Sequence, residues 1–170
     1  RAGILDRYLS SAQRALLAQA GSMAATWSRE APRLFEVRID GQRARAEVEA
    51  YAAELQLGGA TARESSDSGP LTFFALALDA RGKPIPVLHS DVSFALFLQD
   101  PPAGMLAQVV ASIMRPFPAG LVTDAGLLVA NPVHASEAVR RAFDRNAYHG
   151  TVTWSWQQAL LAAGLERQLA

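Results

Sequence analysis

Cysteine is absent from this sequence, and two other features that mark particular protein classes are absent as well. Without cysteine, the chain has no disulfide framework, no zinc–thiolate site and no thiol nucleophile. The longest apolar runs, at 71–78 and 120–130, are too short for a membrane-spanning helix. Lys and Arg number 16 against 16 Asp and Glu, so the chain lacks the positive charge of a nucleic-acid-binding protein. We therefore expect neither a membrane nor a nucleic acid as partner.

The sequence does contain enough apolar material for a folded core. Hydrophobic residues make up 50% of the 170 residues and charged residues 19%, which is typical of a globular chain and not of a disordered one. This length predicts a single domain over residues 1–170, or a piece of a larger domain.

The spacing of apolar residues, together with caps and proline stops, predicts a mainly helical chain. Asp40 is expected to cap a helix, and Gly21 to end one. The strand signals are a short patch at 34–39 and a β-hairpin at 71–88, which turns at 79–83. An exposed loop is expected at 61–70. The predicted helices span 4–19, 42–57, 90–98, 101–115, 136–143 and 151–168. Because strands are few, we predict an all-α fold of stacked helical hairpins with one small β-hairpin.

Candidate chemistry is sparse outside one segment. The three histidines, His89, His134 and His149, are far apart in the sequence, and none forms an i,i+4 metal-binding pair with another. Neither a nucleophile elbow nor a phosphate-binding glycine pattern occurs, so no metal and no cofactor is expected. Each histidine is more often structural than catalytic when it stands alone.

The exception is residues 146–158, which gather aromatic side chains at a predicted helix start. Trp154 and Trp156 are two residues apart, so on a helix they would lie on very different faces. One interpretation is that both indoles pack in the core. The other is a sugar-binding platform, in which aromatic faces stack on pyranose rings and an amide such as Gln157 bonds to hydroxyls. The residues alone leave both interpretations open.

Two stretches resemble the six-hairpin glycosidases, the (α/α)6-toroid enzymes that include the glycogen-debranching amylo-α-1,6-glucosidases. Residues 148–156, Tyr-His-Gly-Thr-Val-Thr-Trp-Ser-Trp, and the Ala-Ala-Gly-Leu run at 162–165 are similar to that family's last-helix signature. Residues 74–79, Phe-Ala-Leu-Ala-Leu-Asp, followed by Gly-Lys-Pro at 82–84 and Ser-Asp at 90–91, resemble a second family stretch. The resemblance covers about 71–165. It differs at Trp-Ser-Trp, where the family has Trp-Pro-Trp, at Gln157, where the family has an acid, and at Asp91, where the family has an asparagine.

The resemblance implies the C-terminal half of a toroid and the hydrolysis of α-glucosidic bonds, as in glycogen or starch, with inversion. Inversion requires two carboxyl groups with a water molecule between them. Asp144, just before the aromatic segment, is the first candidate for the base, and Asp91 is the second. Asp124 is the third, in an apolar stretch where desolvation would disfavour its ionised form. The general acid is expected upstream of Arg1. The residues implied to bind the carbohydrate substrate are Tyr148, His149, Trp154, Trp156 and Gln157.

Half a toroid would expose the inner faces of its helices, so a missing N-terminal half or a second chain is expected to cover them. Two alternatives remain open. A non-catalytic relative would keep the sugar-binding aromatics without the carboxylate pair, as Gln157 suggests. A plain helical interaction module would bury those aromatics in its core and bind no sugar.

Overall fold

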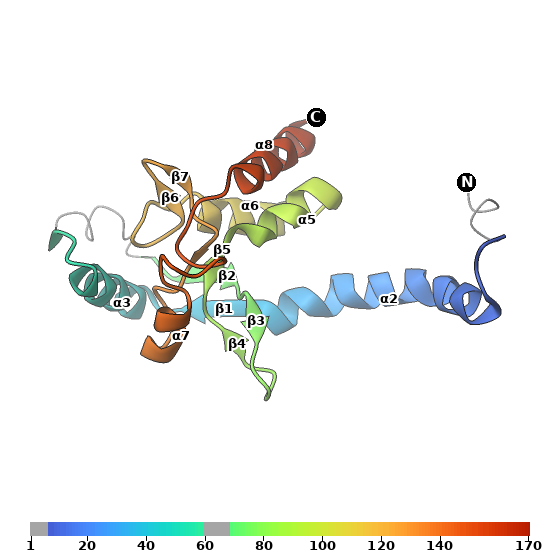
Figure 1. The fold of residues 1–170 in the computed structure, drawn as a ribbon, viewed down its shortest axis with the longest axis horizontal. Coiled ribbons are helices and arrows are strands. Elements are labelled where there is room, and N and C mark those ends of the chain that lie inside the picture. Colours follow the sequence, from blue (N-terminus) through green and yellow to red (C-terminus); the bar gives the residue numbers. More distant parts are fainter. Residues whose placement is uncertain (1–6, 60–68) are drawn as a thin grey trace. The chain divides into compact units, whose positions relative to one another are not determined.

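The computed structural model describes residues 7–59 and 69–170 of the chain. These residues belong to two compact units, Arg1–Leu34 and Phe35–Ala170. The first unit consists mainly of the long helix α2 (Ser11–Phe35), and the second contains every described strand and the remaining described helices (Figure 1).

Helix α2 differs from the helix predicted at 4–19. Ser10 precedes it and forms a reciprocal cap with Gln13: the Ser10 Oγ accepts from the Gln13 amide at 3.3 Å, and the Gln13 Oε1 accepts from the Ser10 amide at 2.7 Å. The helix then continues through Gly21 to Phe35, so the predicted stop was wrong. A helical interior tolerates a single glycine at a cost of about 1 kcal/mol. The predicted start, at residues 4–6, lies outside the described residues.

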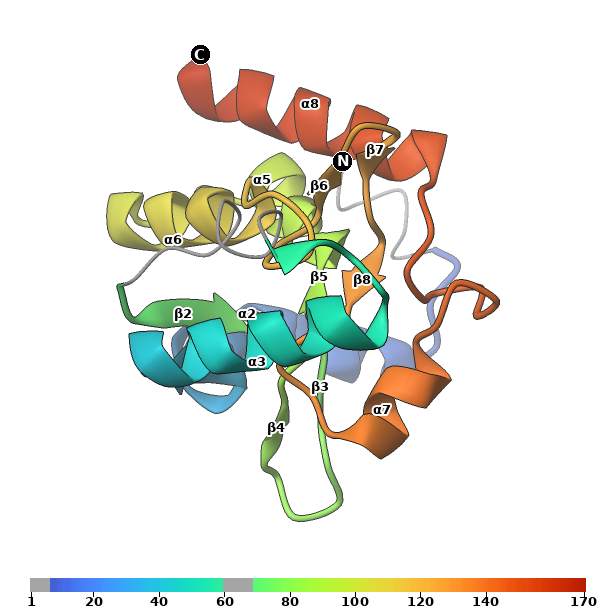
Figure 2. The same ribbon diagram turned by 90° about the vertical axis from the view of Figure 1, so that its left-hand side faces the viewer.

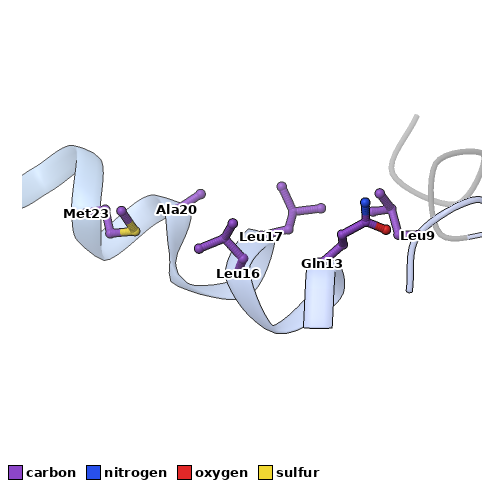
Figure 3. A pocket seen from close by; sticks show the side chains of 6 residues that line it. All are labelled: Leu9, Gln13, Leu16, Leu17, Ala20 and Met23. Atoms are coloured by element: carbon purple, nitrogen blue, oxygen red, sulfur yellow. The ribbon is translucent and has the colours of Figure 1, made fainter. Parts of the chain in front are cut away.

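No described side chain of α2 is buried. Leu16 and Leu17 are more than half exposed, and they form part of an open groove along the helix (Figure 3). This groove is lined by Leu9, Gln13, Leu16, Leu17, Ala20 and Met23. The helix therefore has an apolar face that no described residue of its own unit covers.

In the second unit, helix α3 follows strand β1 and precedes strand β2 along the chain. Strand β1 (Glu36–Ile39) pairs antiparallel with β2 (Leu71–Phe74), and Ile39 lies opposite Leu71. Helix α3 (Gly41–Glu54) begins at the predicted cap, because the Asp40 Oδ1 accepts from the amides of Gln42 and Arg43. Residues alternate between buried and half-buried along β2, as expected for a strand with one face against the core.

The described residues of this unit contain three further pairs of very short strands (Figure 2). Strand β3 (Ala77–Leu78) pairs with β4 (Pro84–Ile85), and this is the predicted hairpin, reduced in length. Strand β6 (Val122–Thr123) pairs with β7 (Gly126–Leu127). Strand β5 (Leu88–His89) pairs antiparallel with β8 (Ala130–Asn131), far along the chain.

The other described helices of this unit precede, separate or follow these strands along the chain. The 3₁₀ turn η1 leads directly into α5, and α8 is the last element of the chain. Their bounds are η1 Ser90–Val92, α5 Ser93–Leu98, α6 Ala103–Ile113, α7 Glu137–Ala142 and α8 Ser155–Leu169. Helices α5, α6, α7 and α8 correspond to four of the predicted helices.

Helices α5 and α8 lie side by side in both views and make close contact (Figures 1 and 2). A Cβ at Gly164 would lie 3.0 Å from the Leu96 Cβ, so glycine allows the two helices to approach. The Gln168 Nε2 donates to the Leu96 carbonyl at 2.6 Å. Leu96 itself is completely buried, in a core that also contains Phe73, Ile113 and Leu121. The contact therefore fixes the C-terminal half of α8 against the C-terminal half of α5.

The all-α toroid prediction was wrong. The second unit is mixed α/β, with four two-stranded antiparallel sheets among residues 35–59 and 69–170. The apolar stretch at 71–78 was predicted as one strand of a local hairpin, and no strand was predicted at 120–132. Each instead contributes strands that pair with segments distant in sequence, and periodicity within one segment carries no signal for such pairing.

Candidate functional site

The loop before α8 is held by its own backbone and by Asp144. The Asp144 Oδ1 accepts from the amides of Asn146 at 2.8 Å and Ala147 at 3.1 Å, which is the role of a turn-capping carboxylate. The Thr151 hydroxyl donates to the Phe143 carbonyl at 3.0 Å and closes the loop. A Cβ at Gly150 would collide with the Asp144 carbonyl oxygen, so only glycine fits at this position. The loop therefore presents the aromatic residues that follow it in a defined position.

Five aromatic side chains form a continuous row at the start of α8, which we call the aromatic row: Tyr148, His149, Trp154, Trp156 and Phe94. The Trp154 ring centroid lies 4.6 Å from that of Tyr148, 4.7 Å from that of His149 and 5.5 Å from that of Trp156. The Trp156 ring lies 6.0 Å from Phe94, on α5. All four distances fall within the range of favourable aromatic pairs.

The two indoles lie together because Trp154 is not helical. Its backbone is extended (φ −117°, ψ 131°), and α8 begins only at Ser155. The expectation that Trp154 and Trp156 lie on different faces of a helix was therefore wrong. Tyr148 is 75% exposed and Trp156 49%, so the row is not sealed in the core.

A carboxylate–amide pair lies beside this row. The Gln157 Nε2 donates to the Asp91 Oδ1 at 2.8 Å, and Gln157 is completely buried. Gln157 follows Trp156 in sequence, and Asp91 precedes Phe94 by three residues. The hydrogen bond therefore joins the start of α8 to η1, and the Phe94–Trp156 ring contact joins it to α5, which follows η1 directly. The Asp91 side chain remains 39% exposed, so solvent reaches the carboxylate.

The side chain of His89 is a neighbour of the Asp91 carboxylate. Its Nδ1 is 3.9 Å from the Asp91 Oδ2, and its side chain is only 9% exposed. Burial lowers the pKa of His89 because it disfavours the charged imidazolium, and this effect outweighs the opposing influence of Asp91 and the carbonyls of Ala75 and Phe74. Near neutral pH the imidazole is therefore uncharged, and the carboxylate has a neutral ring for a neighbour.

The other predicted residues lie elsewhere. Asp124 is exposed in the turn between β6 and β7, so the expected desolvation does not occur. The His134 Nδ1 lies 2.8 Å from the Glu47 Oε2, and His134 is buried, which favours a structural role. Asp144 lies in the loop before α8, and its Oδ1 accepts hydrogen bonds from two backbone amides of that loop. Of the three candidate carboxylates, Asp91 is the one that the fold joins to the aromatic row.

Phe94 and His89 were missing from the predicted set. The available signal was helical phase: Asp91 and Phe94 are three residues apart, so on a helical turn they share one face. Nothing in the sequence indicated that this face would meet α8.

Comparisons with protein-family models, with curated proteins and with solved structures found no match to this chain. Within residues 7–59 and 69–170, no cluster of His, Asp and Glu could hold a metal ion. In the same part of the chain, no helix has both the length and the hydropathy needed to span a bilayer. The geometry of the aromatic row and its polar neighbours therefore carries the functional argument.

Proposed function

We propose that the aromatic row binds carbohydrate, and that the chain is part of a glycoside hydrolase acting on α-glucosidic oligosaccharides. The observation that carries the proposal is the exposed row of rings beside the Asp91–Gln157 pair. Aromatic faces are electron-rich and attract the slightly positive C–H groups on the flat face of a pyranose. A few polar groups at the edge of such a surface bind hydroxyls and set orientation. The sequence resemblance to debranching glucosidases supports the same substrate class.

In this proposal Asp91 is the general base of an inverting reaction. The base removes a proton from water as the water oxygen attacks the anomeric carbon, and a second carboxyl group protonates the departing glycosidic oxygen. Gln157 holds the Asp91 Oδ1, which leaves the Oδ2 to accept the proton. We place Asp91 ahead of Asp144 because the latter caps a turn. The general acid would come from another part of the protein.

One observation favours a second function, carbohydrate binding without hydrolysis. Gln157 occupies the position where the debranching family carries an acid. Its side-chain amide is buried and donates a hydrogen bond to Asp91. Stacking on the aromatic row requires no acid, so a non-catalytic sugar-binding protein would retain every contact described above.

Two substitutions distinguish these functions in the full chain. Binding of maltooligosaccharides is measured by isothermal titration calorimetry, and hydrolysis by the release of reducing ends. We expect Trp156→Ala to weaken binding about tenfold or more. We expect Asp91→Asn to retain binding and to abolish hydrolysis if the chain is catalytic. Binding without hydrolysis in the unmodified protein would favour the second function, and no binding at all would refute both.

A further inference from the structure

The aromatic row crosses from one element to another at Phe94. Phe94 comes from α5, whereas the other four rings come from the loop before α8 or from its first turn. Its ring lies 6.0 Å from Trp156 at an interplanar angle of 54°, and its side chain is 39% exposed. The row therefore has a solvent-accessible end on α5.

The spacing along the row suits a linear ligand with repeated units. Trp154 and Trp156 are 5.5 Å apart, and Trp156 and Phe94 are 6.0 Å apart. Each step is comparable to one sugar ring along an oligosaccharide. The carboxylate of Asp91 is the charged group joined to this part of the row, which disfavours an anionic ligand such as a nucleic acid or a sugar phosphate. A neutral chain of hydroxylated rings fits both the spacing and the charge.

We infer that Phe94 is a further substrate-binding residue, which extends the row so that it takes an oligosaccharide of at least three units in preference to a disaccharide. This inference rests on the proposed carbohydrate binding and adds a chain-length preference to it. Trp154, Trp156 and Phe94 would each contact one unit. The Asp91–Gln157 hydrogen bond keeps Phe94 aligned with Trp156, because it ties α8 to the turn that leads into α5.

The chain offers a matched control for this residue. Phe97 lies on the same helix and is also 39% exposed, but its ring is not a member of the row. Phe94→Ala and Phe97→Ala therefore remove the same group from the same helix at equal exposure. Phe94→Tyr keeps a ring at the row and serves as the conservative variant.

The experiment titrates maltose, maltotriose and maltotetraose into the full chain and the three variants by calorimetry, after thermal melts have shown that each is folded. In the unmodified protein, the affinity should rise about three- to tenfold from maltose to maltotriose. Phe94→Ala should abolish that rise, whereas Phe97→Ala and Phe94→Tyr should retain it.

Different failures have different meanings. Equal affinity for maltose and maltotriose in the unmodified protein would overturn the role of Phe94 and leave sugar binding intact. Equal effects of Phe94→Ala and Phe97→Ala would also overturn it, as would loss of the rise in Phe94→Tyr. If Phe94→Ala fails to fold, Phe94→Leu replaces it as the ring-removing variant. Absence of binding for all three sugars would refute the proposed function itself, and the inference with it.

Discussion

Two exposed tryptophans, Trp27 on α2 and Trp156 on α8, show why exposure alone does not define a site. Trp27 is 58% exposed and Trp156 49%. Trp156 has other aromatic rings and the Asp91–Gln157 hydrogen bond beside it, whereas the groove beside Trp27 is lined by Ser22, Met23 and Thr26, without a second ring or a carboxylate. Apolar surface supplies affinity for many partners, but specific recognition requires placed polar groups as well. The difference identifies the aromatic row as the stronger candidate site.

The largest expected effect is on the free energy of unfolding, and it compares a glutamine beside the aromatic row with a glutamine on α2. Gln157→Ala removes a completely buried side chain and the donor to Asp91, and should lower the free energy of unfolding by about 2–4 kcal/mol. Gln13→Ala on exposed α2 removes only a capping contact and should cost less than about 1 kcal/mol. Urea denaturation followed by circular dichroism measures both. Comparable losses in the two variants would contradict the assignment of Gln157 to the core of the site.

The next effect concerns ligand affinity at the two tryptophans. Trp156→Ala should weaken maltotriose binding about tenfold, which corresponds to about 1.4 kcal/mol. Trp27→Ala removes a tryptophan of similar exposure and should leave the affinity unchanged. Calorimetric titration of both variants provides the comparison. If Trp156→Ala lowered only the melting temperature, its ring would be packing and not a sugar contact.

A third prediction concerns pH and the two buried histidines of the second unit. Burial lowers the pKa of His89 and of His134 below the ordinary value of 6.5. The unfolded chain therefore binds protons more readily, and stability should fall as the pH drops through about 6.5 toward each lowered pKa, by at most about 1.4 kcal/mol per pH unit for each histidine.

His134→Asn tests this prediction, because asparagine keeps a donor near Glu47 but cannot titrate. Burial is the main cause of the His134 shift, and the Glu47 contact opposes it. Melting temperatures at pH 7.5 and pH 5.5 should differ less in the variant than in the unmodified protein. An identical difference would show that His134 does not contribute to the pH dependence.

The smallest expected effect is at Leu16 on α2. Because this side chain is 61% exposed and α2 buries no described side chain, Leu16→Gln should change the free energy of unfolding of the second unit by less than about 0.5 kcal/mol. Hydrogen exchange, which resolves the two units separately, measures the change. A large loss of protection in the second unit would show that the α2 groove is normally covered.

Helices and their caps were the part of the fold that could be predicted from the sequence. The Asp40 cap and the helices that became α3, α6 and α8 all follow from short-range spacing and caps. The aromatic segment before α8 was also identified in advance. The stop at Gly21 was wrong, since one glycine is too weak a signal to end a helix without a following turn.

Long-range pairing was the part that could not be predicted. Ile39 lies opposite Leu71 with a whole helix between them in sequence, and His89 lies opposite Ala130. Strands of two residues leave almost no periodicity, so they are defined by their partners and not by their own residues. The same holds for Phe94, which joins the aromatic row only because α5 packs against α8.

The sequence by itself determined that a cluster of Tyr, His and Trp side chains would precede the last helix, because those residues are neighbours along the chain. The tertiary structure decided that this cluster stays exposed, that Asp91 is the carboxylate beside it, and that Phe94 extends it. The physical reason is that proximity along a chain is set by covalent bonds. Proximity between distant segments depends on which faces are buried together, and Leu96 and Gly164 allow that close contact between α5 and α8.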